Sequence, residues 1–268
     1  MKLILTLCLV GLGFATLRSA RGAEPRDVMF VSETDQTEQR YVELLPENFN
    51  PDEKHDDVLA FHGHGSDRWQ FIRESRHECR GVRDVAARHG MILLSPDYRA
   101  KTSWMGPRAE ADVLQILKEV KQQHKIGRVY LAGGSMGGTA VLTFAVLHPE
   151  FVDGVCSLNG TANLVEYDQF QEAIRASFGG TKAEVPMEYR RRSAEFFPEK
   201  FTMPLACTTG GKDTAVPPES VLRLVDLLKK LDRPVLSLHH DDGGHSTDYA
   251  DTCAAMEFIL SQAEQKSR

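Results

Sequence analysis

Residues 128–141 have the sequence RVYLAGGSMGGTAV, and this stretch decides how the rest of the chain is expected to fold. It begins with β-forming residues, which predict a short buried strand, and it ends in an apolar run that predicts a helix. Between them lies GGSMG, with Ser135 at its centre. Glycines two positions before and after a serine allow a turn so tight that the serine side chain projects beyond the sheet edge. The pattern G-x-S-x-G between a strand and a helix is therefore typical of a turn that exposes a nucleophile.

The rest of the chain alternates short apolar runs with helical stretches, which predicts an α/β fold with a mostly parallel central sheet flanked by helices. A polar turn joins two further strand-like runs near the start, and one long helix is expected over residues 68–88. Residues 159–202 break the alternation and predict a short cap-like insertion above the sheet. The apolar runs that predict the central strands are residues 58–61, 91–95, 129–132, 151–158, 204–208 and 235–238.

Composition and the first residues limit the classes of protein to consider. Hydrophobic residues make up 41% of the 268, enough for the core of one domain, expected over residues 24–268. The net charge of −6 disfavours a nucleic-acid partner. Residues 1–23 combine Lys2, an apolar run too short for a comfortable membrane span, and small residues near its end. This pattern predicts a signal peptide and an exported protein, periplasmic or secreted, with no stable membrane partner after its removal.

Four cysteines remain after the predicted signal peptide, and an exported protein can pair them. Cys156 and Cys207 lie in apolar strand-like runs, where small buried side chains are expected. Cys79 and Cys253 lie in separate predicted helices, so a Cys79–Cys253 disulfide is one possibility that the sequence leaves open. No spacing of cysteine or histidine indicates a zinc site.

A serine nucleophile needs a base, and the base needs a carboxylate to orient it. In a parallel sheet such groups belong in loops at the carboxyl ends of strands. Asp213 follows one predicted strand and His245 follows the last, which gives the chain order Ser135, Asp213, His245. The competing residues are weaker candidates: the two other histidines belong to a strand, and the two other acids lie only a few residues before the histidine. These competitors are His239, His240, Asp241 and Asp242.

An oxyanion hole is the third requirement of such a site. The amide of Met136, which follows the nucleophile, is one expected donor. The other is expected from HGHG, residues 62–65, which follows a predicted central strand. His64 is the preferred second donor and Gly65 the alternative. Two alternating histidines also suggest a metal site, but no third ligand has suitable spacing, so no metal or other cofactor is expected and His62 is assigned a structural role.

With these residues in place, the chain resembles the α/β-hydrolases, and among them the small secreted serine esterases grouped with the prolyl oligopeptidase catalytic domain and with acetylxylan and feruloyl esterases. The resemblance covers about residues 40–263. It does not extend to the β-propeller of prolyl oligopeptidases, which favours an esterase with an open site. The motifs that carry it are FHGHGSD (61–67), SPDY (95–98), GGSMGG (133–138), HP (148–149), GKD (211–213), VPP (216–218) and GH (244–245).

The resemblance implies hydrolysis of carboxylic esters through an acyl-enzyme, with a small-molecule or saccharide ester as substrate, such as acetyl or feruloyl esters of carbohydrates. A serine peptidase of the prolyl oligopeptidase type is the alternative, and a non-catalytic binding protein is a third hypothesis. Trp104 and Tyr98 are candidate substrate-binding residues, with packing as the competing role for each. The run of arginines at 190–192 is expected to form a solvated helix face rather than an anion site.

Overall fold

The computed structural model describes residues 24–266, whose central feature is one eight-stranded sheet with the strand order β1-β2-β4-β3-β5-β6-β7-β8. β1 pairs with β2, and β2 with β4, in antiparallel fashion, and the remaining pairs are parallel. The predicted signal peptide, residues 1–23, lies outside the described residues. The strands are β1 (Arg26–Val31), β2 (Glu38–Leu44), β3 (His55–Phe61), β4 (Ile92–Pro96), β5 (Ile126–Gly134), β6 (Gly154–Leu158), β7 (Leu205–Gly210) and β8 (Val235–His240).

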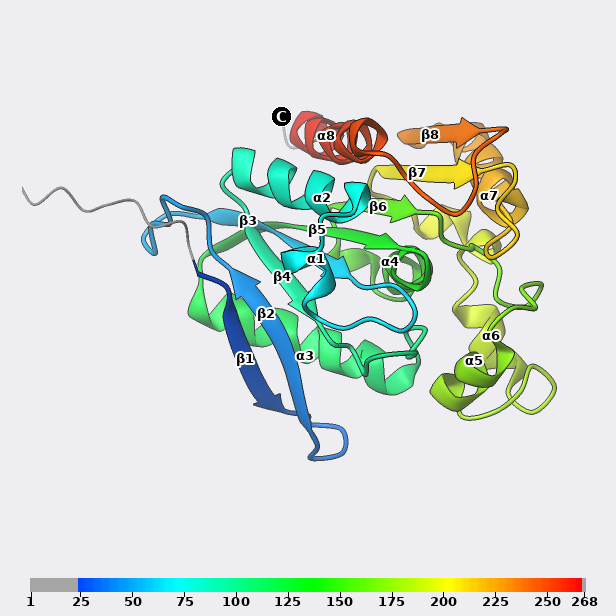
Figure 1. Ribbon diagram of the computed structural model, residues 1–268, viewed down its shortest axis with the longest axis horizontal. Coiled ribbons are helices and arrows are strands. Elements are labelled where there is room, and N and C mark those ends of the chain that lie inside the picture. Colours follow the sequence, from blue (N-terminus) through cyan, green and yellow to red (C-terminus); the bar gives the residue numbers. More distant parts are fainter. Residues whose placement is uncertain (1–23, 267–268) are drawn as a thin grey trace, which may run out of the picture.

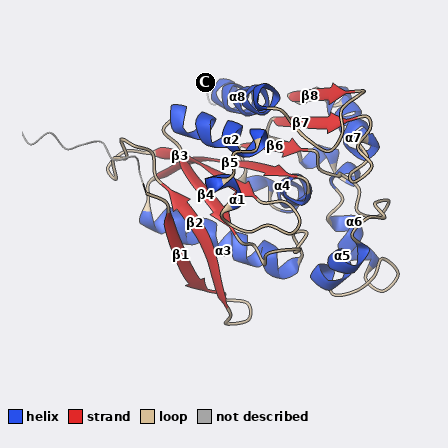
Figure 2. Ribbon diagram, in the orientation of Figure 1, coloured by secondary structure: helices blue, strands red, loops and turns tan. Residues whose placement is uncertain are grey.

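Helices cover both faces of the sheet, as Figures 1 and 2 show, and the predicted fold class is confirmed. Within residues 24–266, no helix combines the length and apolar character that crossing a membrane requires. The α-helices are α1 (Gln70–Arg73), α2 (His77–Arg88), α3 (Pro107–Gln123), α4 (Met136–Leu147), α5 (Gln171–Phe178), α6 (Pro186–Arg191), α7 (Glu219–Lys230) and α8 (Tyr249–Lys266), and the 3-10 turns are η1 (Pro149–Phe151), η2 (Ala194–Phe196) and η3 (Pro198–Lys200).

Two hydrophobic cores result from the two covered faces. Side chains alternate across a strand, so successive residues of β3 enter different cores: Val58 belongs to the core that also contains residues of α2 and α8, and Leu59 to the core that contains residues of α3, α4 and α7. The central strands β4, β6 and β7 are buried along their whole length. This double burial explains why they are continuous apolar runs rather than alternating ones.

The single helix expected over residues 68–88 is divided into α1 and α2. Glu74 ends α1 in an extended conformation, and α2 begins at His77. Because of this break, α1 and α2 contact different parts of the protein. The Gln70 side chain in α1 accepts a hydrogen bond from the loop after β3, whereas Val82 and Val85 in α2 pack in the core that also contains residues of α8.

No disulfide joins the four cysteines that the structure describes, and the possible Cys79–Cys253 bridge is absent. α2 and α8 lie side by side (Figure 1), and their close approach occurs at Gly81, where an added Cβ would lie 2.7 Å from Thr252. Cys79 instead lies in the core, and burial raises the pKa of its thiol to about 12. Gly81 thus allows the helices to approach closely without a covalent bond, and Tyr249 of α8 donates a hydrogen bond to Asp84 of α2 at 2.8 Å.

The insertion between β6 and β7 contains α5 and α6, which lie beyond the carboxyl ends of the central strands, at the right of Figure 1. The expectation of a solvated arginine face is wrong for Arg192, whose side chain is completely buried. It donates to Glu110 at 2.6 Å and to the Met105 carbonyl at 2.8 Å. Although burial alone would raise it, the pKa of Glu110 is lowered to about 2 by the hydrogen bond from His148 and the charge of Arg192.

Replacing Arg192 with methionine is expected to lower the free energy of unfolding by about 3 kcal/mol, because it leaves a largely buried carboxylate without its main counter-charge. Urea denaturation of Arg192→Met measures this change. The neighbouring Arg190→Met is the matched control, since Arg190 is exposed and should change stability by less than about 1 kcal/mol. Equal stability of the two variants would contradict a structural role for the buried ion pair.

Candidate active site

Ser135 occupies the predicted turn between β5 and α4. Its backbone has φ 58° and ψ −119°, a strained conformation for a residue with a side chain. The flanking glycines are required by close backbone contacts: a Cβ on Gly137 would lie 1.9 Å from the Phe61 carbonyl oxygen, and one on Gly133 would lie 2.4 Å from the Gly137 oxygen. The strand–turn–helix predicted from residues 128–141 is therefore confirmed.

A continuous hydrogen-bonded chain links Ser135 to His245 and Asp213. His245 Nε2 lies 2.8 Å from Ser135 Oγ, and His245 Nδ1 lies 2.6 Å from Asp213 Oδ2. The other carboxylate oxygen of Asp213 accepts the amides of Ala215 and Val216, at 3.0 and 2.9 Å. Only one carboxylate oxygen is thus directed to the imidazole, and the Asp213 side chain is almost completely buried.

Contact between the loops after β7 and β8 brings the acid and the base together. The Gly211 amide donates to the His240 carbonyl and the Lys212 amide to the Gly243 carbonyl. A Cβ on Gly210 would lie 2.3 Å from the Gly244 oxygen, so only glycine permits this approach. The two loops therefore act as one unit that holds His245 over Ser135.

The competing histidines and acids have other partners. His239 contacts the Thr209 hydroxyl at 2.8 Å, and His240 contacts Asp251 at 2.5 Å. Asp241 and Asp242 are more than nine-tenths exposed. None of these side chains belongs to the chain of hydrogen bonds that ends at Ser135.

The candidate oxyanion donors are the backbone amides near Ser135 that donate no hydrogen bond within the protein. The Gly63 amide donates to Gln70 Oε1 at 2.7 Å, and the Gly65 amide donates to the Lys101 carbonyl at 2.8 Å. Among the described residues, no acceptor is found for the His64 amide between them. Met136 is the first residue of α4, where amides have no partner within the helix. His64 and Met136 are thus the candidate donors, and Gly65 is not.

His62 supports this loop from beneath. Its ring is buried, with Nδ1 2.8 Å from the Gly63 carbonyl and Nε2 3.1 Å from the Asp97 carbonyl. Burial lowers the pKa of His62, and the hydrogen bonds to the two carbonyls oppose this effect. In the described part of the chain, no cluster of three or more histidine, cysteine, aspartate or glutamate side chains could hold a metal ion.

Ser135 and His245 open into a cavity of about 350 Å³. Its walls combine a phenyl ring and an aliphatic side chain with two charged side chains and two amides. The lining residues are Gly63, His64, Gln70, Arg76, Glu78, Gly134, Ser135, Leu158, Asn159, Phe170, Ala215, His245 and Thr247.

Trp104 and Tyr98 are not part of this lining, contrary to the prediction that they contact substrate. Trp104 is completely buried, donates from its indole nitrogen to His64 Nδ1 at 3.2 Å, and packs 5.4 Å from the ring of Phe170. Tyr98 is also buried and donates to the His62 carbonyl at 2.6 Å. Trp104 thus contacts the His64 ring and Tyr98 the His62 carbonyl, so both side chains support the HGHG loop.

Eight of the lining residues escaped the sequence analysis: Gln70, Arg76, Glu78, Leu158, Asn159, Phe170, Ala215 and Thr247. Gln70 lies in the first turn after the HGHG loop, but no motif identifies it. Phe170 lies in the irregular insertion, and Asn159 directly follows β6, at the carboxyl edge where functional residues were expected. The position of Asn159 at this edge was the one feature of the sequence that could have identified it. Asn159 has φ 52°, its Oδ1 accepts from the Thr247 hydroxyl at 2.5 Å, and its buried amide nitrogen has no partner among the described residues.

Several solved structures share this fold. FphF, a fluorophosphonate-binding serine hydrolase of Staphylococcus aureus, is 19% identical over 91% of this chain and 99% of its own, with a TM-score of 0.67. An S-formylglutathione hydrolase from Agrobacterium tumefaciens is 18% identical over 92% and 96%, with a TM-score of 0.68. The acylaminoacyl peptidase of Pyrococcus horikoshii is 17% identical over 90% of this chain but only 41% of its own, with a TM-score of 0.65.

A search of curated proteins found no match in sequence. The model of the prolyl oligopeptidase family, in contrast, matches residues 87–261, which is more than half of the chain and includes Ser135, Asp213 and His245. The strained serine turn and the surrounding sheet agree with this match. The chain therefore belongs to the prolyl oligopeptidase family of serine hydrolases with the α/β-hydrolase fold.

Proposed function

We propose that the protein hydrolyses small carboxylic esters through a triad of Ser135, His245 and Asp213. The observation that carries this proposal is the unbroken hydrogen-bonded chain of these three side chains at the edge of a cavity. His245 Nε2 is placed to accept the hydroxyl proton as Ser135 Oγ attacks the ester carbonyl. Asp213 keeps the other ring nitrogen protonated and stabilises the imidazolium that forms.

The tetrahedral oxyanion would be held by the amides of Met136 and His64. These amides lie at the start of α4 and in the HGHG loop, which Gln70, Lys101 and the His62 ring hold in place. Fixed donors of this kind stabilise charge only as it develops, which lowers the barrier. His245 then protonates the leaving alcohol, and water repeats the sequence to free the acid.

The shape and polarity of the cavity support a small polar ester, and an ester of a carbohydrate in particular. About 350 Å³ accommodates a short acyl group with one sugar ring. The Phe170 ring provides an aromatic wall, whereas Arg76 and Glu78 provide hydrogen-bonding groups for an alcohol rich in hydroxyls. Acetyl esters of saccharides combine a short acyl group with such an alcohol, and feruloyl esters instead offer an aromatic acyl group that can pack against Phe170.

A peptidase is the second candidate, because the family match and the similarity to an acylaminoacyl peptidase structure both allow it. Steady-state kinetics with acetylated and feruloylated sugars and with aminoacyl-prolyl amides compares the two. We expect the higher kcat/KM for the saccharide esters, with short p-nitrophenyl esters reporting whether the serine reacts at all. A higher kcat/KM for the amides would replace the esterase proposal with a peptidase, and inactivity on the whole panel would favour a binding protein.

A further inference from the structure

The ring of His64 is a polar group of the catalytic cavity that the proposed mechanism does not use, because the mechanism assigns only the His64 backbone amide. His64 lines the cavity together with Ser135 and His245. Its Nδ1 accepts a hydrogen bond from the buried indole nitrogen of Trp104 at 3.2 Å. Within residues 24–266, no partner is found for its Nε2. One ring nitrogen is therefore bound within the protein and the other is not.

The unpartnered nitrogen can be reached by a ligand. The two nitrogens lie on different edges of the imidazole ring, so Nε2 points away from Trp104. His64 is partly exposed, and its Nε2 keeps accessible surface, unlike the enclosed atoms Ser103 Oγ and Asn159 Nδ2, which also have no partner among the described residues. The free edge of the ring is thus open to a molecule that occupies the catalytic cavity.

The hydrogen bond from Trp104 decides where the ring proton lies. An indole N–H can only donate, so His64 Nδ1 must be unprotonated in order to accept it. A neutral imidazole carries its one proton on the other nitrogen, which here is Nε2. Burial lowers the pKa of His64, which agrees with a neutral ring. Nε2–H is therefore a neutral hydrogen-bond donor.

Aromatic side chains from two other segments hold the His64 ring in this orientation. The ring centroid of Phe170, the residue before α5, lies 4.5 Å from that of His64, with the two planes tilted by 46°. Trp104 in turn packs against Tyr167, with centroids 5.5 Å apart. Such contacts between rings favour particular orientations. A donor that is already held in place loses little conformational freedom when a ligand binds, which increases its contribution to affinity.

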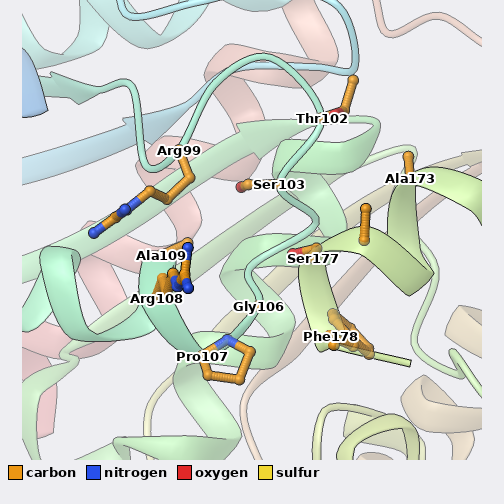
Figure 3. Close-up of a pocket in the computed structure, with 12 residues that line it drawn as sticks. Arg99, Thr102, Ser103, Gly106, Pro107, Arg108, Ala109, Ala173, Ser177 and Phe178 are labelled. Carbon is orange, nitrogen blue, oxygen red and sulfur yellow. The ribbon is translucent and has the colours of Figure 1, made fainter. Parts of the chain in front are cut away.

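The segments that carry these rings contact each other directly. Trp104 lies in the loop between β4 and α3, which Figure 3 shows beside α5. A second cavity, of about 450 Å³, lies between this loop and α5. At one edge of that cavity, a Cβ on Gly106 would lie only 2.2 Å from the Ser177 carbonyl oxygen. The backbone contact fixes the loop against the insertion, and with it the indole against Phe170.

We propose that His64 Nε2–H donates a hydrogen bond to an oxygen in the alcohol part of the ester, so that the ring selects alcohols rich in hydroxyl and ether oxygens. This inference rests on the proposed esterase function. An acetyl group has no acceptor besides its carbonyl oxygen, which is assigned to the amides of Met136 and His64. The remaining acceptors of an acetylated sugar belong to its alcohol part. An uncharged donor also suits an uncharged sugar.

The specificity ratio of His64→Phe tests the proposal. The ratio divides kcat/KM for a methyl glucoside acetylated at its primary hydroxyl by kcat/KM for phenyl acetate, which has the same acyl group but no further oxygen. Phenylalanine keeps a ring and the backbone amide, and a disturbed oxyanion hole would affect both esters alike. We expect the ratio to fall about fivefold through a higher KM for the sugar ester, because a neutral hydrogen bond is lost equally from the ground state and the transition state.

Three further variants separate the donor from the rest of the ring. His64→Gln places an amide N–H near the position of Nε2 and should recover part of the ratio. Trp104→Phe removes the donor that fixes the tautomer and should lower the ratio by a smaller factor, with Trp69→Phe as its matched control, since Trp69 does not line the cavity. His89→Phe is the matched control for His64→Phe, because His89 contacts Glu257 instead. Neither control should change the ratio.

The ring proton can also be located in the wild-type protein, which requires no variant to be active. Long-range proton–nitrogen NMR of the histidine rings distinguishes the two neutral tautomers, and His64→Gln identifies the His64 signals. We expect the proton on Nε2. A proton on Nδ1 would overturn the proposal. An unchanged ratio in His64→Phe would do so too, and if the wild type cleaves phenyl acetate it would refute this inference alone. A wild type that cleaves neither ester would refute the proposed function and this inference with it.

Discussion

If Ser135 is the proposed nucleophile, Ser135→Ala is expected to reduce kcat for ester cleavage by about a million-fold, as removal of the nucleophile does in enzymes with a Ser-His-Asp triad. Ser135 Oγ is the atom that would form the acyl-enzyme, and within residues 24–266 it is the one hydroxyl hydrogen-bonded to His245 Nε2, at 2.8 Å. Alanine keeps the Cβ of the strained turn, so the fold and the free energy of unfolding should change little. Steady-state kinetics with a p-nitrophenyl ester and a fluorophosphonate labelling assay measure the loss.

The control for this variant is Ser261→Ala, which removes an exposed hydroxyl bonded only to the Phe258 carbonyl. It should retain full activity and full labelling. Ester cleavage that is equal in the wild type and in Ser135→Ala would show that Ser135 is not the nucleophile and would refute the proposed mechanism.

Asp213→Asn is expected to lower kcat about 10⁴-fold while leaving KM and stability nearly unchanged. The amides of Ala215 and Val216 donate to Asp213 Oδ1, so the side-chain oxygen of an asparagine would occupy the Oδ1 position and accept these two hydrogen bonds. Its NH₂ group would then face His245 Nδ1 and donate to it. The imidazole proton would move to Nε2, where it prevents the ring from accepting the Ser135 proton.

Asp241→Asn and Asp242→Asn are matched controls, because both acids lie near His245 in sequence but are exposed. Each should retain wild-type kcat, measured at the same pH as Asp213→Asn. A loss of less than about 10-fold in Asp213→Asn, or a comparable loss in either control, would assign the orienting role to another group.

Local sequence was sufficient to predict the serine turn. The requirement for glycine at 133 and 137 arises from backbone atoms only a few residues away or in the adjacent strand. The alternation of apolar runs and helical stretches similarly predicted the parallel sheet, because strands covered on both faces must be apolar throughout. Chain order and the rule that functional loops follow the carboxyl ends of strands selected Asp213 and His245 over their competitors.

The same reasoning failed where a side chain's environment depends on distant segments. Arg192 has the appearance of a surface residue in sequence, yet Glu110 and the Met105 carbonyl, more than 80 residues away, surround it. Trp104 was expected in the cavity, but Phe170 from the insertion occupies that wall and covers it. Neither contact has a local signal.

The sequence by itself thus determined the fold class, the serine turn and the chain order of the three candidate catalytic residues, because these follow from backbone sterics and from hydrophobic periodicity. Only the tertiary structure decided which amides remain free beside Ser135, which side chains line its cavity, and that a second cavity exists beneath α5. These features depend on how the insertion and the loop after β4 pack together. Such packing is set by shape complementarity between segments far apart in the chain, which no short stretch of sequence encodes.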